Sequence, residues 1–157
     1  MSNKKYEFTG ETKEWRGHIL HRIRAIVDIA YAKAGEFGGW IESESNLSEN
    51  GDAWVFGDAK VCGDAKVYGN AEVYGNVCVC GDAEVKQSSD YIVVKNCWSS
   101  MRWFTYTRSN KKWKVGCFYG TGEELIKKAY ADSETSGKCY EAIVRVVEAI
   151  EEAKKED

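Results

Sequence analysis

A six-residue pattern repeats without interruption through the middle of this 157-residue chain. Glycine recurs every six residues from Gly51 to Gly81, a small residue follows two positions later, and valine follows two positions after that. Residues two apart in an extended segment point to the same side, so the small residue and the valine face one interior. Glycine with Asp or Asn forms the corners, because these residues accept a positive φ at low cost. The pattern predicts a solenoid of short strands.

Three six-residue sides make a coil of 18 residues, so residues 18 apart are expected to stack. The repeats at 47–86 then form about two coils, with Trp54 over Glu72, Lys60 over Cys78 and Lys66 over Glu84. The expected fold class is α+β, with a short parallel β-helix of hexapeptide repeats followed by a small β3α2 module. We expect N-terminal strands and a cap at 1–46, the β-helix at 47–86 and the module at 90–157.

The segment that leads into the repeats carries a resemblance. Its motifs are Lys33-Ala34-Gly35, Gly38-Gly39-Trp40-Ile41, Asn46-Leu47-Ser48, Gly51-Asp52 and Trp54. Residues 5–86 resemble hexapeptide-repeat left-handed β-helix proteins, in particular the enterobacterial transferase type and its phage and prophage relatives. The resemblance implies a left-handed helix and self-association as a dimer or trimer.

The C-terminal module is expected to contain three strands, at 91–98, 102–108 and 113–119, because these stretches are rich in aromatic and β-branched residues. Thr121 and Glu124 have the spacing of a capping box and predict a helix start. A second helix is expected at 137–154. The run from Gly116 to Glu124 resembles a small domain found at the end of phage-encoded repeat proteins.

An acyltransferase of the hexapeptide type is one alternative that the resemblance implies. Those enzymes use a histidine as general base and bind coenzyme A between coils. The chain has only two histidines, His18 and His21, both before the repeats, and the repeats have no inserted loop. The sequence therefore assigns no catalytic residue and no cofactor, and it favours a binding protein over an enzyme.

The six cysteines include no C-x-x-C pair, and no export signal precedes them. They are interpreted as reduced thiols of a cytoplasmic protein. Cys62, Cys78 and Cys80 are the one set to test for a metal, because Cys62 stacks on Cys80, but no metal ligand is assigned. No apolar run reaches the length of a membrane span, so no membrane contact is expected.

Two candidate binding surfaces remain. The first is an aromatic face of the repeats, which needs a cover from this chain or from another subunit. The second is a basic, aromatic part of the C-terminal sheet, where cations could bind phosphates while rings stack on bases. The alternative for that sheet is one face packed on the helices and a solvated basic hairpin. The aromatic face comprises Trp54, Phe56 and Tyr74, and the basic sheet comprises Arg102, Trp103, Phe104, Tyr106, Arg108, Lys111, Lys112 and Trp113.

The functional expectation is a non-enzymatic binding protein encoded by a phage or prophage. It is expected to engage a host protein and to antagonise bacterial immunity. A nucleotide or nucleic-acid binder that uses the basic sheet is the first alternative, and the acyltransferase is the second. The formal net charge of −3 is too small to decide among them.

Overall fold

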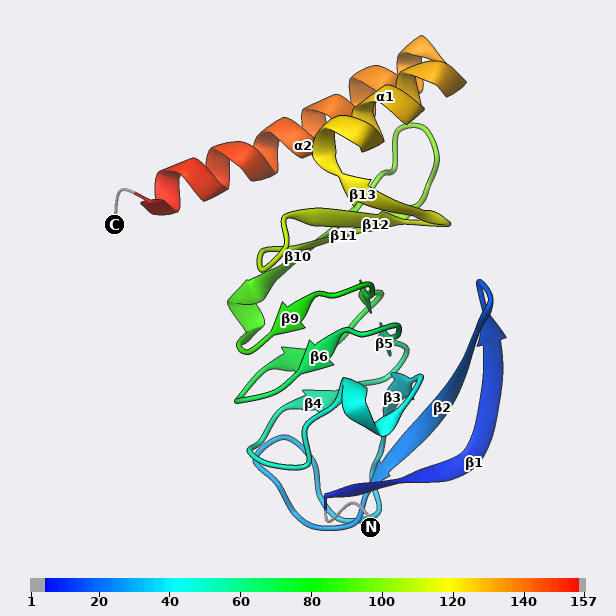
Figure 1. The fold of residues 1–157 in the computed structure, drawn as a ribbon, viewed down its shortest axis with the longest axis vertical. Coiled ribbons are helices and arrows are strands. Elements are labelled where there is room, and N and C mark those ends of the chain that lie inside the picture. The colour runs from blue at the N-terminus through cyan, green and yellow to red at the C-terminus, as the bar shows by residue number, and fades with distance from the viewer. Residues whose placement is uncertain (1–4, 156–157) are drawn as a thin grey trace.

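The computed structural model describes residues 5–155. A long β-hairpin comes first and runs along the side of the repeats toward the C-terminal sheet (Figure 1). It consists of β1 (Tyr6–Trp15) and β2 (His18–Ala25), and β2 pairs antiparallel with β3 (Phe37–Ile41). β3 then pairs parallel with a strand of the repeats, so the hairpin is joined to them by backbone hydrogen bonds.

The repeats form two-residue strands separated by turns, and these strands pair in parallel 18 residues apart. Trp54 pairs with Glu72, Lys60 with Cys78 and Lys66 with Glu84, which confirms the expected stacking. Each corner glycine has a positive φ, as the corner interpretation requires. The strands are β4 (Trp54–Val55), β5 (Lys60–Val61), β6 (Lys66–Val67), β7 (Glu72–Val73), β8 (Cys78–Val79) and β9 (Glu84–Val85).

The expected fold class, a left-handed parallel β-helix followed by a β3α2 module, is wrong. The described strands do not form one solenoid sheet but are divided among four sheets. β5 and β8 belong to a mixed five-stranded sheet of order β1-β2-β3-β5-β8, while β4-β7 and β6-β9 are separate pairs. The physical reason is that β3 takes the free edge of β5 and draws one side of the repeats into the sheet of the hairpin. We call residues 47–86 the repeat stack.

The C-terminal sheet is antiparallel and has four strands in sequence order, not three. The strand expected at 113–119 is divided by a two-residue turn at Gly116, whose φ is +55°. Val115 and Phe118 are paired across this turn. The strands are β10 (Tyr91–Lys95), β11 (Trp103–Thr107), β12 (Lys112–Val115) and β13 (Phe118–Thr121).

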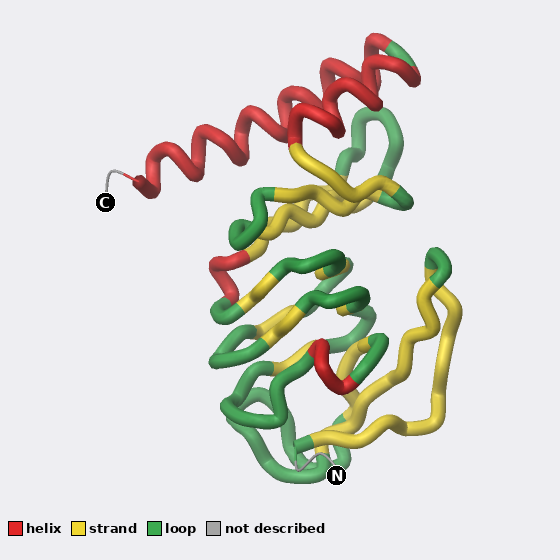
Figure 2. The backbone as a smooth tube through the Cα atoms, in the orientation of Figure 1, coloured by secondary structure: helices red, strands yellow, loops and turns green. Residues whose placement is uncertain are grey.

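Two helices cover the face of this sheet that points away from the repeat stack (Figures 1 and 2). α1 (Gly122–Asp132) begins at the expected capping box, in which Thr121 and Glu124 exchange hydrogen bonds. α2 (Glu134–Lys155) begins before the expected residue 137. Gly137 lies inside α2 and packs against the Tyr130 ring, where an added Cβ would come within 2.2 Å of the ring. Within residues 5–155, neither helix combines the length and the apolar character that a membrane crossing needs.

Two main hydrophobic cores result. One fills the repeat stack with the valine and alanine series and extends to Tyr6 and Ile23 of the hairpin. The other lies between the C-terminal sheet and its helices, around Phe104, Trp113 and Val144. A smaller cluster lies where the hairpin crosses the repeat stack, and it contains Leu20, Trp40, Cys62, Cys78 and Cys80.

Backbone hydrogen bonds link the two coils, and side-chain hydroxyls replace them at the end of the stack. In the first coil, residues 54, 60 and 66 donate their N–H groups to carbonyls 71, 77 and 83 of the next coil. In the second coil no further coil follows residues 72, 78 and 84. Their N–H groups are bonded at 2.8 to 3.1 Å to the hydroxyls of Ser88, Thr105 and Ser109.

The other end of the stack is closed by the amide of Asn46, which is fully buried. Its Oδ1 accepts hydrogen bonds from the N–H groups of Glu42 and Ser43. Its Nδ2 donates to the carbonyls of Gly63 and Ala65. The first end of the stack is thus satisfied by the backbone of β3 and of Ser48 together with the Asn46 amide, and the last end by three side-chain hydroxyls.

Replacing Thr105 with Val should destabilise the protein by about 1–3 kcal/mol, because the Cys78 N–H is then buried without an acceptor in an otherwise similar volume. Urea unfolding measures the loss. Thr135→Val is the matched control, since Thr135 is exposed in α2 and should change stability by less than about 0.5 kcal/mol. Equal stability of the two variants would contradict the capping role of the hydroxyl.

Candidate functional site

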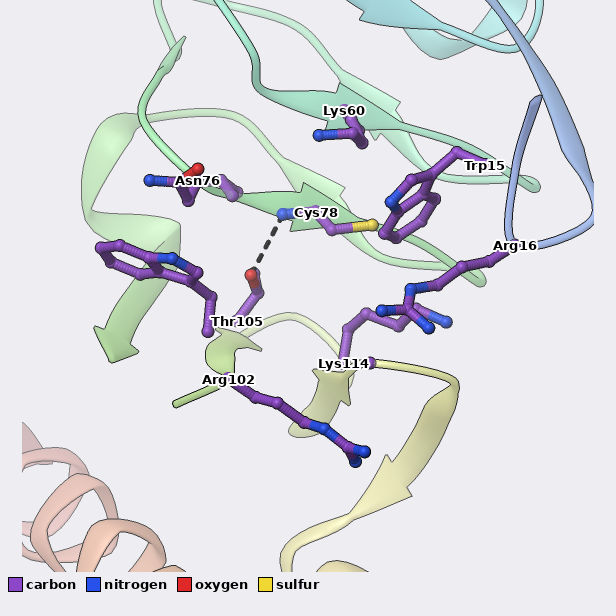
Figure 3. Close-up of a pocket in the computed structure, with 11 residues that line it drawn as sticks. Trp15, Arg16, Lys60, Asn76, Cys78, Arg102, Thr105 and Lys114 are labelled. Carbon is purple, nitrogen blue, oxygen red and sulfur yellow. Dashed lines mark hydrogen bonds between the residues drawn. The ribbon is translucent and has the colours of Figure 1, made fainter. Parts of the chain in front are cut away.

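A cavity of about 240 Å³ opens where the hairpin tip, the repeat stack and the C-terminal sheet meet (Figure 3). Each of these parts contributes side chains, although they are far apart in the sequence. The lining residues with polar or aromatic side chains are Trp15, Arg16, Lys60, Asn76, Cys78, Arg102, Trp103, Thr105 and Lys114.

The hairpin tip supplies Trp15 and Arg16. Trp15 pairs with His18 across a two-residue turn, and both turn residues, Arg16 and Gly17, have positive φ. Such a turn matches the right-handed twist of the two strands. Arg16 Nη1 lies 2.9 Å from the Cys117 sulfur, so the tip contacts the turn between β12 and β13.

The floor of the cavity is the end of the repeat stack. Lys60 lies on β5, and its Nζ donates to the carbonyl of Asp58 at 3.0 Å. Cys78 lies on β8, and its backbone N–H donates to the Thr105 hydroxyl at 3.0 Å, as the dashed line in Figure 3 shows. The hydroxyl that caps the stack therefore also fixes β11 against the cavity.

The cavity is strongly cationic. Arg16, Lys60, Arg102 and Lys114 line it, and no carboxylate does. Among residues 5–155 none of these four forms an ion pair with a carboxylate. The Nζ atoms of Lys60 and Lys114 lie 5.5 and 5.6 Å from the centre of the Trp15 ring, within cation–π range. Unpaired cations in a concave site attract anions.

A second cavity of about 410 Å³ shares Asn76 and Trp103 with the first. Its walls are aromatic, with Tyr74, Tyr91 and Trp103. The Tyr91 hydroxyl donates to the carbonyl of Glu72 at 2.7 Å. Burial raises the pKa of Tyr91 to about 12, so this phenol stays neutral and keeps its hydrogen bond at ordinary pH.

We call the two cavities together the inter-module groove. One end offers four cations and the other offers three aromatic rings, with the Asn76 amide and the Trp103 ring between them. Anionic groups suit the first end, and a planar ring suits the second. The described lining contains no histidine and no carboxylate that could act as a general base.

The structure brings together three of the residues that the sequence analysis assigned to separate surfaces. Arg102 and Trp103 from the basic sheet and Tyr74 from the aromatic face all line the inter-module groove. The other two members of the aromatic face are covered by this chain. Trp54 is 1% exposed and contacts Tyr6, and Phe56 lies between Tyr31 and Tyr74.

The remaining residues of the basic sheet lie outside the groove. Strand alternation places Phe104, Tyr106 and Trp113 on the helix side, where they are buried in the core. Arg108 forms an ion pair with Glu151 at 2.7 Å. Lys112 lies over the Tyr119 ring, and Lys111 lies beside the acidic end of α2.

Residues that the sequence analysis did not assign to any site are Trp15, Arg16, Lys60, Asn76 and Lys114. A signal for the first two was present: the Trp-Arg-Gly-His run fits a two-residue hairpin turn, which presents its flanking side chains at a tip. No local signal links that tip to Lys60 or Lys114, because their proximity depends on how the modules pack.

Both histidines are occupied by neighbours. His18 Nδ1 lies 2.9 Å from a carboxylate oxygen of Glu42, and His21 stacks on Phe8 with the ring centres 4.4 Å apart. Burial opposes ionisation of Glu42, but the hydrogen bonds from His18 and the Gly63 N–H hold the pKa of this carboxyl below its usual value. Neither histidine lines the inter-module groove.

Behind the groove, Cys62, Cys78 and Cys80 form a buried thiol cluster with their sulfur atoms within 4.8 Å of one another. Hydrogen bonds from the thiols of Cys78 and Cys80 lower the pKa of Cys62 to about 4. Burial raises the pKa of Cys78, and the interaction with Cys62 raises that of Cys80 to about 12.

Arg102→Gln should leave the melting temperature unchanged or raise it by about 1–2 °C at low salt, because it removes one of four like charges that lack carboxylate partners. The gain should vanish in high salt, where charge repulsion is screened. Scanning fluorimetry measures both effects. Lys111→Gln is the control, because Lys111 faces the carboxylates of α2, and its neutralisation should give no gain. A clear destabilisation of the Arg102 variant would contradict unrelieved repulsion.

Comparison with models of protein families and with curated protein sequences finds no match to this chain. The geometry of the groove and of the thiol cluster is therefore the basis on which a function can be assigned.

Proposed function

We propose that the protein binds a nucleotide, or a similarly phosphorylated aromatic metabolite, in the inter-module groove. The observation that carries this proposal is the pairing of a cationic cavity with an aromatic one through shared residues. Neither half alone would suggest it, because cations without rings suit any anion, and rings without cations suit any apolar group.

Phosphates fit the cationic end. Arg102 and Arg16 can each donate two parallel hydrogen bonds to phosphate oxygens, and Lys60 and Lys114 act as point charges. All four are free of carboxylate partners among the described residues, so no ion pair must break before a phosphate binds.

A base fits the aromatic end. Tyr74 is 57% exposed and Trp103 is 40% exposed, so each ring offers a free face. Stacking of a base on an aromatic ring contributes about 1–3 kcal/mol. Asn76 lies at the junction, where an amide can donate to and accept from polar edges of the ligand.

Binding without turnover is the activity that the lining supports. The hydroxyl groups of Ser88 and Thr105 already accept backbone hydrogen bonds, and the Cys78 thiol is part of the buried cluster. A protein of this kind acts by removing its ligand from solution, which is a form of the nucleotide-binding alternative stated in the sequence analysis.

Isothermal titration of the full chain with ATP, and separately with inorganic triphosphate, tests the proposal. ATP should bind, and Lys114→Gln or Arg102→Gln should weaken it about tenfold through loss of one charge-assisted contact. Tyr74→Ala should weaken ATP but not triphosphate, because it removes only a stacking surface.

Lys111→Gln and Trp98→Ala are the matched controls, since they remove a cation and an exposed indole that lie outside the groove. Neither should change the affinity for ATP by more than about twofold. An affinity for ATP that survives Arg102→Gln and Tyr74→Ala together would refute the groove as the binding site.

A protein partner is the second candidate, and an apolar surface favours it. Trp98, Val94, Ile143 and Val146 line a cavity of about 390 Å³ between α2 and the edge of the C-terminal sheet. Trp98 is 73% exposed and Val146 is 58% exposed, which is unusual for large apolar side chains that lie together. The predicted dimer or trimer would bury this surface.

Sedimentation velocity of the full chain tests this candidate. The protein should sediment as more than one chain, and the double variant Trp98→Ser, Val146→Thr should sediment as a monomer, because its apolar contact is lost. Ile19→Thr is the control, as Ile19 is 52% exposed on the hairpin, away from this surface. A double variant that assembles like the wild type would exclude this surface as the interface.

A further inference from the structure

We infer that the thiol cluster of Cys62, Cys78 and Cys80 is a binding site for one soft, thiolate-seeking cation such as Zn²⁺ or Cu⁺. Thiolate ligands select these ions over hard cations. The site lies between the repeat stack and the hairpin, behind the groove in which the proposed ligand binds, and Cys78 belongs to both.

The geometry of the three sulfur atoms suits a single ion. A Zn–S bond of about 2.3 Å places the sulfur atoms of a tetrahedral or trigonal site about 3.8–4.0 Å apart. The three sulfur atoms already lie within 4.8 Å of one another, and those of Cys78 and Cys80 are 2.9 Å apart. Side-chain adjustments of about an ångström are therefore sufficient to bring all three into the coordination shell.

The repeat pattern produces this convergence. Cys78 and Cys80 are two apart on one extended segment, so their side chains point to the same side. Cys62 lies 18 residues before Cys80 and so occupies the same position one coil earlier. In the other repeats these outward positions hold larger or charged side chains, and only this side of the stack carries three sulfur atoms.

The surroundings exclude water and balance charge. Cys62 is fully buried, and Cys78 and Cys80 are each 8% exposed, under a cover of Leu20, Trp40 and Trp15. Binding of Zn²⁺ would release three thiol protons and leave one net negative charge on the ion and its three sulfur ligands. The positive charge of Lys114 acts on the thiols of Cys62 and Cys80 and offsets part of that charge.

A hydrogen-bonded pair of His18 and Glu42 adjoins the cluster through Gly63. Glu42 holds His18 through Nδ1 at 2.9 Å, and the same carboxylate accepts the N–H of Gly63, the residue after Cys62. A carboxylate on one ring nitrogen is the usual partner of a metal-binding imidazole, because it fixes the tautomer and leaves the other nitrogen as an acceptor. His18 therefore has the partner of a metal-binding imidazole, but it lies outside the group of three converging sulfur atoms.

The test uses the full chain carrying Cys97→Ser, Cys117→Ser and Cys139→Ser, which removes the three cysteines outside the cluster. We expect one Zn²⁺ per chain by elemental analysis, and Cd²⁺ should give a thiolate-to-metal absorption band that saturates at one equivalent. Zinc at a hundred times its dissociation constant should raise the melting temperature by about 5–10 °C. Zinc should also protect all three remaining thiols from a thiol reagent together.

Cys62→Ser added to this background should weaken zinc binding roughly a hundredfold or more, with an unchanged circular dichroism spectrum. The inference would be overturned if the chain bound less than one Zn²⁺ and Cd²⁺ gave no thiolate absorption band. It would also be overturned if the Cys62→Ser variant bound zinc as tightly as its parent. If the Cys62 variant does not fold, thiol protection in the three-cysteine background still decides, because no ligand is altered there. ATP binding is measured separately, so failure of one site leaves the other standing.

Discussion

The open edge of a short repeat stack is the constraint on which the rest of this structure depends. A two-coil stack leaves one N–H group per side without a partner; the N–H of Cys78 is buried, where an unpaired donor costs about 1–3 kcal/mol, and those of Glu72 and Glu84 are exposed. Here the three donors of residues 72, 78 and 84 are satisfied by Ser88, Thr105 and Ser109. The hydroxyls of Thr105 and Ser109 belong to β11 and to the turn that follows it. The hydrogen bonds that cap the repeat stack therefore also fix the position of the C-terminal sheet.

This capping arrangement determines where the groove can form. β11 must lie with Trp103 and Thr105 toward the stack and Phe104 and Tyr106 toward the helices. The cations at 102 and 114 are then held over the end of the stack, close to Lys60 and to the hairpin tip. The groove thus forms where the C-terminal sheet caps the last coil of the repeat stack. The same packing places its four cationic side chains where no carboxylate lines the cavity.

The local parts of this structure are readable from the sequence. The 18-residue stacking of Trp54 on Glu72 and the Thr121–Glu124 capping box both follow from short-range patterns, and both occur as predicted. The sheet organisation does not follow, because the pairing of β3 with β5 joins segments whose sequences carry no sign of it. The groove could not be predicted as one site for the same reason. Tyr74, Arg102 and Trp103 were each assigned to a surface, but their meeting with Trp15 and Lys60 depends on module packing that strand alternation cannot supply.

The hairpin tip gives this architecture a route for evolutionary change. Arg16 and Gly17 occupy a two-residue turn that neither hydrophobic core includes, yet the side chains at the tip form one wall of the groove. Substitutions at the tip therefore alter which ligands fit while the two cores and the edge caps stay intact. The positive φ of Gly17 strains any side chain placed there, so the variation open to this wall of the groove falls on the side chain of residue 16.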